Sequence, residues 1–105
     1  MQRIARGEVW LVDLGMVAKV RPALVFSVTF NDQERAVYAI VPHTTAPRGG
    51  RFEIEIRVPW LKAGVFDVQG LRNIPGSVFV RRLGVLDESQ LAALIPSAKA
   101  WLGIP

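Results

Sequence analysis

The sequence predicts a mainly β fold, a small curled antiparallel sheet that ends in one α-helix. Between residues 8 and 83, short apolar and β-branched runs recur, and glycine, proline or polar turn residues separate them. The segment 52–58 alternates strictly between apolar and charged residues, which is typical of a strand with one face in water. Helical periodicity is found only near the end of the chain, from Asp87 to Leu102.

Composition limits the class of protein. The 105 residues suffice for one hydrophobic core, so we expect a single domain over residues 1–105. Cysteine is absent, which excludes disulfides and thiolate metal sites. No apolar run approaches the roughly 20 residues of a membrane span, and the first residues lack a signal-peptide segment. We therefore expect a cytoplasmic protein without membrane contact, and its 50% hydrophobic content favours a homodimer.

The charge favours a polyanionic partner such as nucleic acid. The formal net charge is +4, and 10 of the 13 cationic side chains are arginines. The planar guanidinium group matches the oxygens of a phosphate with paired hydrogen bonds, which lysine cannot do. The composition therefore indicates contact with phosphate groups.

Turn residues divide the first part of the chain into strands. Gly15 ends the first strand, and a short basic loop continues to Lys19. The segment 70–77 carries no pattern that predicts an element. We expect strands over residues 8–14, 23–28, 36–41, 52–58, 64–69 and 79–83.

Two prolines are expected to mark strand ends. Pro22 lacks a backbone N–H and fixes φ, so it should stand at the start of the second strand, directly before the apolar residues 23–28. It also holds the preceding residue, Arg21, in an extended conformation at the mouth of that apolar run. Pro42 should end the third strand for the same reason.

The C-terminal segment predicts an amphipathic helix. Asp87 and Gln90 have the spacing of a capping box, and the helix should reach Leu102. Pro96 should kink or break it, because proline removes one hydrogen bond and crowds the carbonyl of Ala92. The predicted apolar face consists of Leu91, Leu94, Ile95, Ala98, Trp101 and Leu102. Five to seven antiparallel strands followed by one helix describe an SH3-like small barrel.

Three segments, in order, resemble the MazF/PemK toxins, the ribonuclease half of bacterial toxin–antitoxin pairs. They are Arg6–Leu14, Lys19–Val25 and Val41–Thr45. Further on, Val65–Gln69 followed by Arg72 is similar to a family strand that ends in glutamine with a basic residue shortly after. The likeness extends roughly from Arg6 to Leu94.

The resemblance implies a dimeric SH3-like barrel that cleaves single-stranded RNA without a metal ion or cofactor and is neutralised by a cognate antitoxin. The family's reaction-centre residues correspond here to Arg21 and Thr44. Arginines 48, 51, 81 and 82 either follow the RNA backbone or form an ordinary solvated face. As substrate-binding residues we expect Thr45, Arg48, Arg51, Gln69 and Arg72.

The implied reaction sets chemical requirements that these residues meet. The 2′-OH of RNA attacks the adjacent phosphate and leaves a 2′,3′-cyclic phosphate and a 5′-OH. Arg21 would stabilise the charge on the phosphoryl oxygens, and Thr44 would add its hydroxyl or its backbone N–H. His43 is the one side chain that titrates near neutrality, and it is either a general base or a packed histidine without catalytic duty. In an extended chain His43 shares a face with Thr45, opposite to Thr44.

Two other functions are compatible with the same architecture. One is a non-catalytic inhibitor like the CcdB-type toxins, which poison DNA gyrase through a protein contact. The other is an inactive relative that only binds RNA or an antitoxin. The fold alone does not separate these functions from RNA cleavage.

Overall fold

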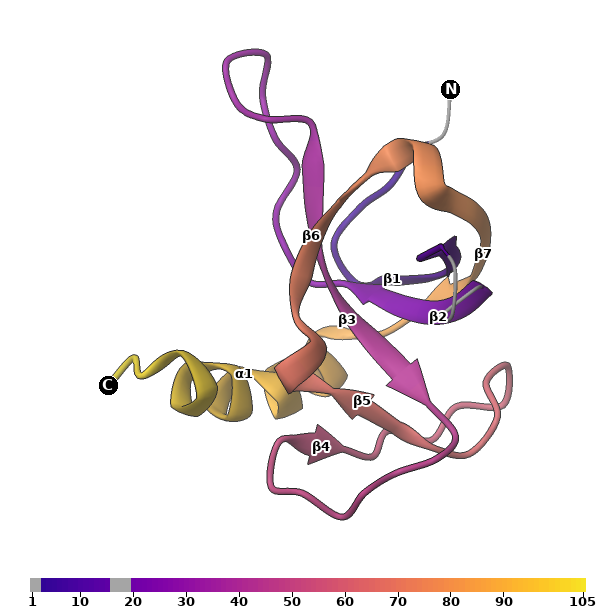
Figure 1. Ribbon diagram of the computed structural model, residues 1–105, viewed down its shortest axis with the longest axis vertical. Helices are drawn as coiled ribbons and strands as arrows, with labels where there is room; N and C mark the ends of the chain where they lie inside the picture. Colours follow the sequence, from indigo (N-terminus) through magenta and orange to yellow (C-terminus); the bar gives the residue numbers. More distant parts are fainter. Residues whose placement is uncertain (1–2, 16–19) are drawn as a thin grey trace.

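Strand β3 runs through the centre of the protein, and the other strands are arranged around it (Figure 1). The computed structural model describes residues 3–15 and 20–105, so most of the predicted loop from Gly15 to Lys19 lies outside the described residues. The elements in chain order are β1 (Glu8–Asp13), β2 (Val20–Val25), β3 (Val37–Thr44), β4 (Glu53–Ile54), β5 (Val65–Asp67), the 3-10 helix η1 (Val68–Gly70), β6 (Arg72–Pro75), the 3-10 helix η2 (Gly76–Val78), β7 (Phe79–Val85) and α1 (Glu88–Leu102).

The described residues form seven strands in one antiparallel sheet with the order β4-β5-β3-β2-β1-β7, and β6 also pairs with β3. The predicted class is therefore confirmed: a mainly β, SH3-like small barrel of five to seven antiparallel strands with a C-terminal helix. No helix in the described part of the chain is long and apolar enough to cross a membrane.

The prediction that Pro22 begins the second strand is wrong, because β2 begins two residues earlier, at Val20, and ends at Val25. The N–H of Phe26 donates to the carbonyl oxygen of Ala39 in β3. Backbone nitrogens two residues apart point to the same edge of a strand, so the nitrogen of Pro22, four residues earlier, also points toward β3. Pairing with β3 begins only at Ala23, whereas β1 pairs with β2 from Val20 onward. Pro22 is thus tolerated where β2 has a neighbour on one side only.

The prediction that Pro42 ends the third strand is also wrong, since β3 continues to Thr44. The nitrogen of Pro42 faces away from β2, toward the edge that β3 shares with β6 and β5. Pairing with β6 stops at Ile40 and pairing with β5 starts at His43, so Pro42 occupies the gap between them. The gap is filled by Gly70, where an added Cβ would lie 2.5 Å from the Pro42 ring.

The predicted strand 52–58 is reduced to β4, two residues long. Its partner β5 supplies two pairs only, Glu53 with Asp67 and Ile54 with Phe66. The alternation nevertheless predicts burial correctly. The apolar residues of this segment pack against the core while the charged residues 55 and 57 are exposed.

The predicted strand 64–69 ends early, at Asp67, where the chain turns into η1. The carboxylate of Asp67 accepts the N–H of Gln69 and so caps this turn. The segment 70–77, which has no sequence signal, contains β6 and begins η2. The sixth predicted strand, 79–83, is present as the slightly longer β7.

The capping box predicted for the helix is confirmed. Asp87 accepts the N–H of Gln90, whose side chain accepts the N–H of Asp87. The expected break at Pro96 does not occur, and α1 runs through it to Leu102. Both Pro96 and Ala92 lie on the exposed side of α1, where water can hydrogen-bond the carbonyl that Pro96 leaves unpaired.

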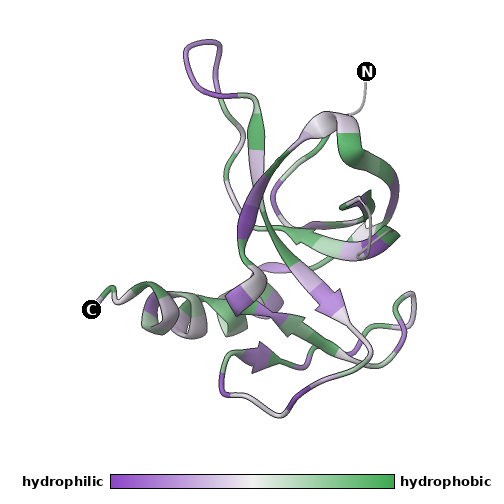
Figure 2. Ribbon diagram, viewed as in Figure 1, coloured by the Kyte–Doolittle hydropathy of each residue, from purple (hydrophilic) through white to green (hydrophobic). Residues whose placement is uncertain are grey.

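The core consists of two clusters on opposite faces of the central strands. In the first cluster Val9, Leu24 and Val41 of the strands gather with Leu91 and Leu94 of α1. The intervening residues of the same strands form the second cluster, which includes Trp10, Val12, Ala23, Val25 and Ile40. The middle parts of β1, β2 and β3 are buried on both faces, and their residues 9–12, 22–25 and 37–42 are accordingly apolar without alternation (Figure 2). The end of the predicted helix face is less buried, since Ile95, Trp101 and Leu102 remain partly exposed.

His43 is buried among these apolar residues, with 3% of its surface exposed. Its ring packs edge-on against Phe66, with centroids 4.9 Å apart. Burial lowers the pKa of His43 below 6.5, because the charged imidazolium would lose its hydration. The folded protein therefore favours neutral His43.

The stability of the protein should depend on pH through His43, the one histidine of the chain. Because its pKa is lowered on folding, the free energy of unfolding should be constant above the unfolded pKa of about 6.5 and decrease below it. Urea unfolding at pH 7.5 and pH 5.5 should show this decrease. The variant His43→Gln should lose most of the difference. Equal stability of the wild-type protein at both pH values would contradict the assignment.

Gly84→Ala should destabilise the fold. Gly84 pairs with Val9 in β1, and an added Cβ would overlap the indole of Trp60. We expect a loss of about 1–3 kcal/mol, typical of overpacking, measured by urea or thermal unfolding. Gly50→Ala is the matched control, because its added Cβ would meet no atom within 4 Å. A Gly84→Ala protein as stable as Gly50→Ala would contradict this packing.

Candidate active site

A groove opens where β2 and β3 stop pairing. Their last pair is Ala23 with Pro42, and beyond it β2 stays with β1 while β3 pairs with β5. The two strand ends therefore separate. Arg21 on β2 and Thr44 on β3 both line the groove, whose volume is about 720 Å³.

The groove brings together most of the residues that the sequence predicts for the site. Arg21 is exposed, and its backbone is fixed by pairing with Val12 of β1. Arg72 begins β6, opposite Ile40 of β3. The predicted residues that line the groove are Arg21, Thr44, Arg48, Gln69 and Arg72.

Two predicted residues lie elsewhere. Thr45 lines a smaller adjoining hollow of about 370 Å³, which shares Arg21, His43 and Thr44 with the main groove. Arg51 does not line either hollow, and its guanidinium stacks on the ring of Phe52, 4.5 Å from the centroid. Thr45 therefore adjoins the site, whereas Arg51 is directed to an aromatic neighbour.

Thr44 has a hydroxyl that is positioned by its own turn. Its Oγ1 accepts the N–H of Ala46 at 3.1 Å, which leaves the hydroxyl proton available to another acceptor. The backbone carbonyl of Thr44 lies against Gly64, where an added Cβ would overlap it. A glycine is therefore required at position 64 to bring β5 this close to the end of β3.

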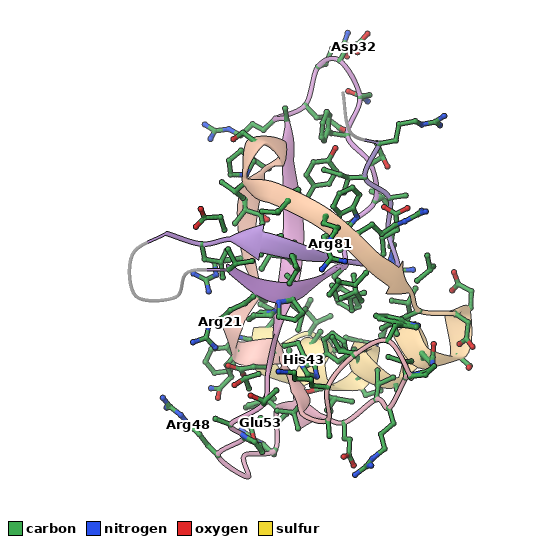
Figure 3. All side chains as sticks on the ribbon, turned by 90° about the vertical axis from the view of Figure 1, so that its right-hand side faces the viewer. Arg21, Asp32, His43, Arg48, Glu53 and Arg81 are labelled. Atoms are coloured by element: carbon green, nitrogen blue, oxygen red, sulfur yellow. The ribbon has the colours of Figure 1, made fainter. Side chains whose placement is uncertain are left out.

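His43 forms part of the groove wall without being exposed in it. Figure 3 shows His43 and Arg21 on the same part of the molecule, with Arg48 and Glu53 below them, and all four residues line the groove. Thr44, the next residue of β3, is only half-buried. The alternation of β3 thus directs His43 to the core and Thr44 toward solvent.

The groove also contains residues that the sequence analysis did not single out. Glu53 and Asp67 contribute carboxylates, and Trp101 of α1 contributes an indole that packs on Phe52. Glu53 appeared only as a charge on the wet face of a strand, because no local pattern reveals its contacts with residues 48–50. Asp67 two residues before Gln69 fits a turn cap, a signal that could have been found.

Backbone donors engage both carboxylates. Glu53 accepts the N–H groups of Arg48, Gly49 and Gly50, and these bonds, that of Arg48 foremost, hold the pKa of Glu53 below 4.5. Asp67 accepts the N–H of Gln69 at 3.1 Å. The guanidiniums of Arg21, Arg48 and Arg72 thus outnumber the groove's two carboxylates. Such a surface can bind anionic oxygens.

The other arginines named by the sequence analysis lie outside the groove. Arg82 pairs with the buried carboxylate of Glu8 at 3.1 Å, and Glu8 also accepts the indole N–H of Trp10. Arg81, the next residue of β7, is exposed (Figure 3). Over residues 3–15 and 20–105, no three His, Asp or Glu side chains gather as a metal site would require.

Solved structures share the fold over nearly the whole chain. A MazE-MazF structure from Deinococcus radiodurans matches with a TM-score of 0.82 and 19% identity over 100% of both chains. An endoribonuclease from a Mycobacterial species, in complex with its cognate antitoxin, matches with a TM-score of 0.83 and 19% identity over 98% of both chains. The Mycobacterium tuberculosis toxin MazF-mt6 gives a TM-score of 0.79 and 23% identity, over 93% of this chain and 98% of the toxin.

Sequence comparison gives the family. No curated protein matches the chain. The family model of PemK-like, MazF-like toxins matches residues 5–100. This range contains all the strands and all of α1 except its last two residues. The chain therefore belongs to the PemK-like, MazF-like toxins of type II toxin-antitoxin systems.

Proposed function

We propose that the protein is a toxin endoribonuclease that cuts single-stranded RNA at short sequences without a metal ion. The observation that carries this proposal is the groove in which Arg21 and Thr44 lie on separated strand ends. Membership of the toxin family supports it, as does the shared fold with proteins described as endoribonucleases.

The reaction that fits these residues is an internal transfer of the phosphoryl group. The 2′-oxygen loses its proton and bonds to phosphorus, and the bond from phosphorus to the 5′-oxygen breaks. The 5′-oxygen takes up a proton, so the products carry a 2′,3′-cyclic phosphate and a 5′-OH. Arg21 would bind the non-bridging oxygens, whose negative charge grows in the transition state, and the Thr44 hydroxyl would donate to the same group.

The remaining groove residues are suited to hold the RNA strand. Arg48 and Arg72 would contact flanking phosphates, and the Gln69 amide would hydrogen-bond a base edge. Thr45 in the adjoining hollow and Arg51 on the ring of Phe52 would extend this surface. An open groove of this kind accommodates an unpaired strand, whose bases are free to turn toward the protein.

We further propose the setting of this activity. The domain of residues 1–105 would act in the cytoplasm as a homodimer, and a cognate antitoxin would neutralise it. The family and the antitoxin-bound structural neighbour support the partner. An acidic, partly disordered antitoxin segment that folds over the cationic groove would block RNA directly.

Arg21→Ala should abolish most cleavage while leaving the fold intact, because the guanidinium is lost from a side chain that is exposed. We expect the rate to fall by about 100- to 1,000-fold, as for removal of one transition-state donor. The measurement is cleavage of a long single-stranded RNA in EDTA, with mapping of the cut sites and of the 5′ ends. Wild-type cleavage should leave 5′-OH ends at a short recurring sequence.

Arg35→Ala is the matched control for this experiment. It removes the same charge from the exposed loop between β2 and β3, away from β4 and β5 (Figure 1). It should cut RNA at the wild-type rate. A folded Arg21→Ala protein that cuts as fast as Arg35→Ala would remove Arg21 from the reaction. Growth arrest by Arg21→Ala without RNA cleavage would favour the gyrase-inhibitor function, and RNA binding without product would indicate an inactive relative.

Thr44→Val should slow cleavage by roughly 10- to 100-fold, the cost of one hydrogen bond to a charged group. The change keeps the shape of the side chain but removes the hydroxyl, so kcat should fall more than KM rises. Thr44→Ser retains the oxygen that accepts from Ala46 and should cut nearly as fast as the wild-type protein. Equal rates for Thr44→Val and Thr44→Ser would exclude the hydroxyl and leave the backbone N–H as the donor.

A further inference from the structure

The loop between β3 and β4 provides one of the groove's three arginines. It runs from residue 45 to residue 52, and Ala46, Arg48 and Gly50 line the groove. Gly49 has a φ of +81°, and it is followed by a second glycine. Glycine loses more conformational freedom on ordering than any other residue, so this loop needs a strong contact to keep one shape.

That contact is the carboxylate of Glu53, the first residue of β4. Its Oε1 accepts the N–H of Gly49 at 2.7 Å and the N–H groups of Arg48 and Gly50 at 3.1 Å. Its Oε2 accepts the N–H of Arg48 at 2.9 Å. Three successive N–H groups therefore converge on one side chain, in the manner of a backbone anion site.

Glu53 is itself held in place from the other side. It pairs with Asp67 of β5, and the neighbouring Ile54 pairs with Phe66, which is fully buried. The loop is thereby linked to the core through one carboxylate. The low pKa of Glu53 means that this carboxylate is charged at neutral pH, and hydrogen bonds to a charged acceptor are stronger than neutral ones.

The position of Glu53 is otherwise unfavourable in a groove that binds RNA. A carboxylate repels phosphate, so its removal would by simple electrostatics strengthen RNA binding. The contacts with residues 48–50 predict the opposite. Without Glu53 the loop would be free, and Arg48 would have to be ordered each time that RNA binds.

We propose that Glu53 is a positioning residue for RNA binding, which holds the loop of residues 48–50 so that Arg48 faces the phosphates of the strand. This inference rests on the proposed ribonuclease function. In this role the Glu53 carboxylate acts only through the backbone N–H groups that it accepts. The two effects of Glu53 on RNA affinity, repulsion and loop ordering, have opposite signs, and a single substitution separates them.

The test compares Glu53→Gln with Glu55→Gln. Both changes remove one negative charge, but Glu55 is exposed and pairs with Arg57 at 3.2 Å. The probe is a random-sequence single-stranded RNA with 2′-O-methyl groups, which cannot be cut by 2′-OH attack, and binding is followed by fluorescence anisotropy at one salt concentration. We expect Glu53→Gln to bind about 10-fold more weakly than the wild-type protein. Glu55→Gln should bind equally well or slightly more tightly.

Two further readouts separate positioning from general damage to the fold. Arg48→Ala should weaken binding, and adding Glu53→Gln to it should weaken binding no further, because both changes act through the same guanidinium. On cleavable RNA, Glu53→Gln should raise KM with little change in kcat, because Arg21 and Thr44 are held by strands rather than by this loop. Additive losses from the two substitutions would overturn the proposal.

A measurement without RNA reports on the loop itself. Trypsin cuts after arginine, and cleavage between Arg48 and Gly49 should be at least several-fold faster in Glu53→Gln than in Glu55→Gln or the wild-type protein. Equal cleavage would show that Glu53 does not order the loop. RNA binding by Glu53→Gln as tight as, or tighter than, the wild-type value would show that Glu53 acts only as a repelling charge. A wild-type protein that neither binds nor cuts RNA would overturn the proposed function, and the trypsin result would still decide the loop contact.

Discussion

The groove depends on two prolines that limit the pairing of β2 with β3. Pro22 cannot donate toward β3, so the ladder between the two strands covers only residues 23–25 and 40–42. Pro42 lies where β3 leaves β6 and takes β5 as its neighbour. Past this point each strand follows a different partner, and the backbone separates without any loop insertion. The missing N–H groups that usually exclude proline from sheets here determine where the sheet opens.

The positive and negative side chains of the groove differ in their surroundings. The guanidiniums of Arg21, Arg48 and Arg72 come from β2, from the loop between β3 and β4 and from β6, whereas the two carboxylates of the groove accept backbone N–H groups close to them in sequence. A carboxylate that is already hydrogen-bonded to N–H groups exerts less repulsion on an anionic ligand than a free one. The acidic residues thus stabilise the backbone that forms the groove wall, and the field in the groove remains cationic.

Many elements of the fold and residues of the groove could be predicted from the sequence. The others depend on contacts between segments that local sequence patterns do not reveal. The capping box at Asp87 and the alternation of 52–58 are local signals, and both predicted correctly which residues are capped or buried. Proline was expected only at strand ends, yet Pro22 and Pro42 lie inside strands because one neighbour is missing beside each. β6 gave no signal, since its four residues form a strand only through pairing with β3. The hydrogen bonds from residues 48–50 to Glu53 likewise have no sequence signal, because they depend on the folded loop.

The groove residues differ in how the fold supports them. Arg21 and Thr44 lie at strand positions that are paired on one edge, with β1 and with β5 respectively, so their backbones are fixed while both residues line the groove. Arg48 belongs to a loop with no pairing of its own, and its backbone is ordered by the Glu53 carboxylate. Groups that contact a reacting phosphate must be placed more accurately than groups that hold a flanking part of the strand. In the proposed reaction Arg21 and Thr44 contact that phosphate, and pairing with β1 and β5 fixes their backbones directly. Arg48 would hold a flanking part of the strand, and its loop is ordered by one side chain.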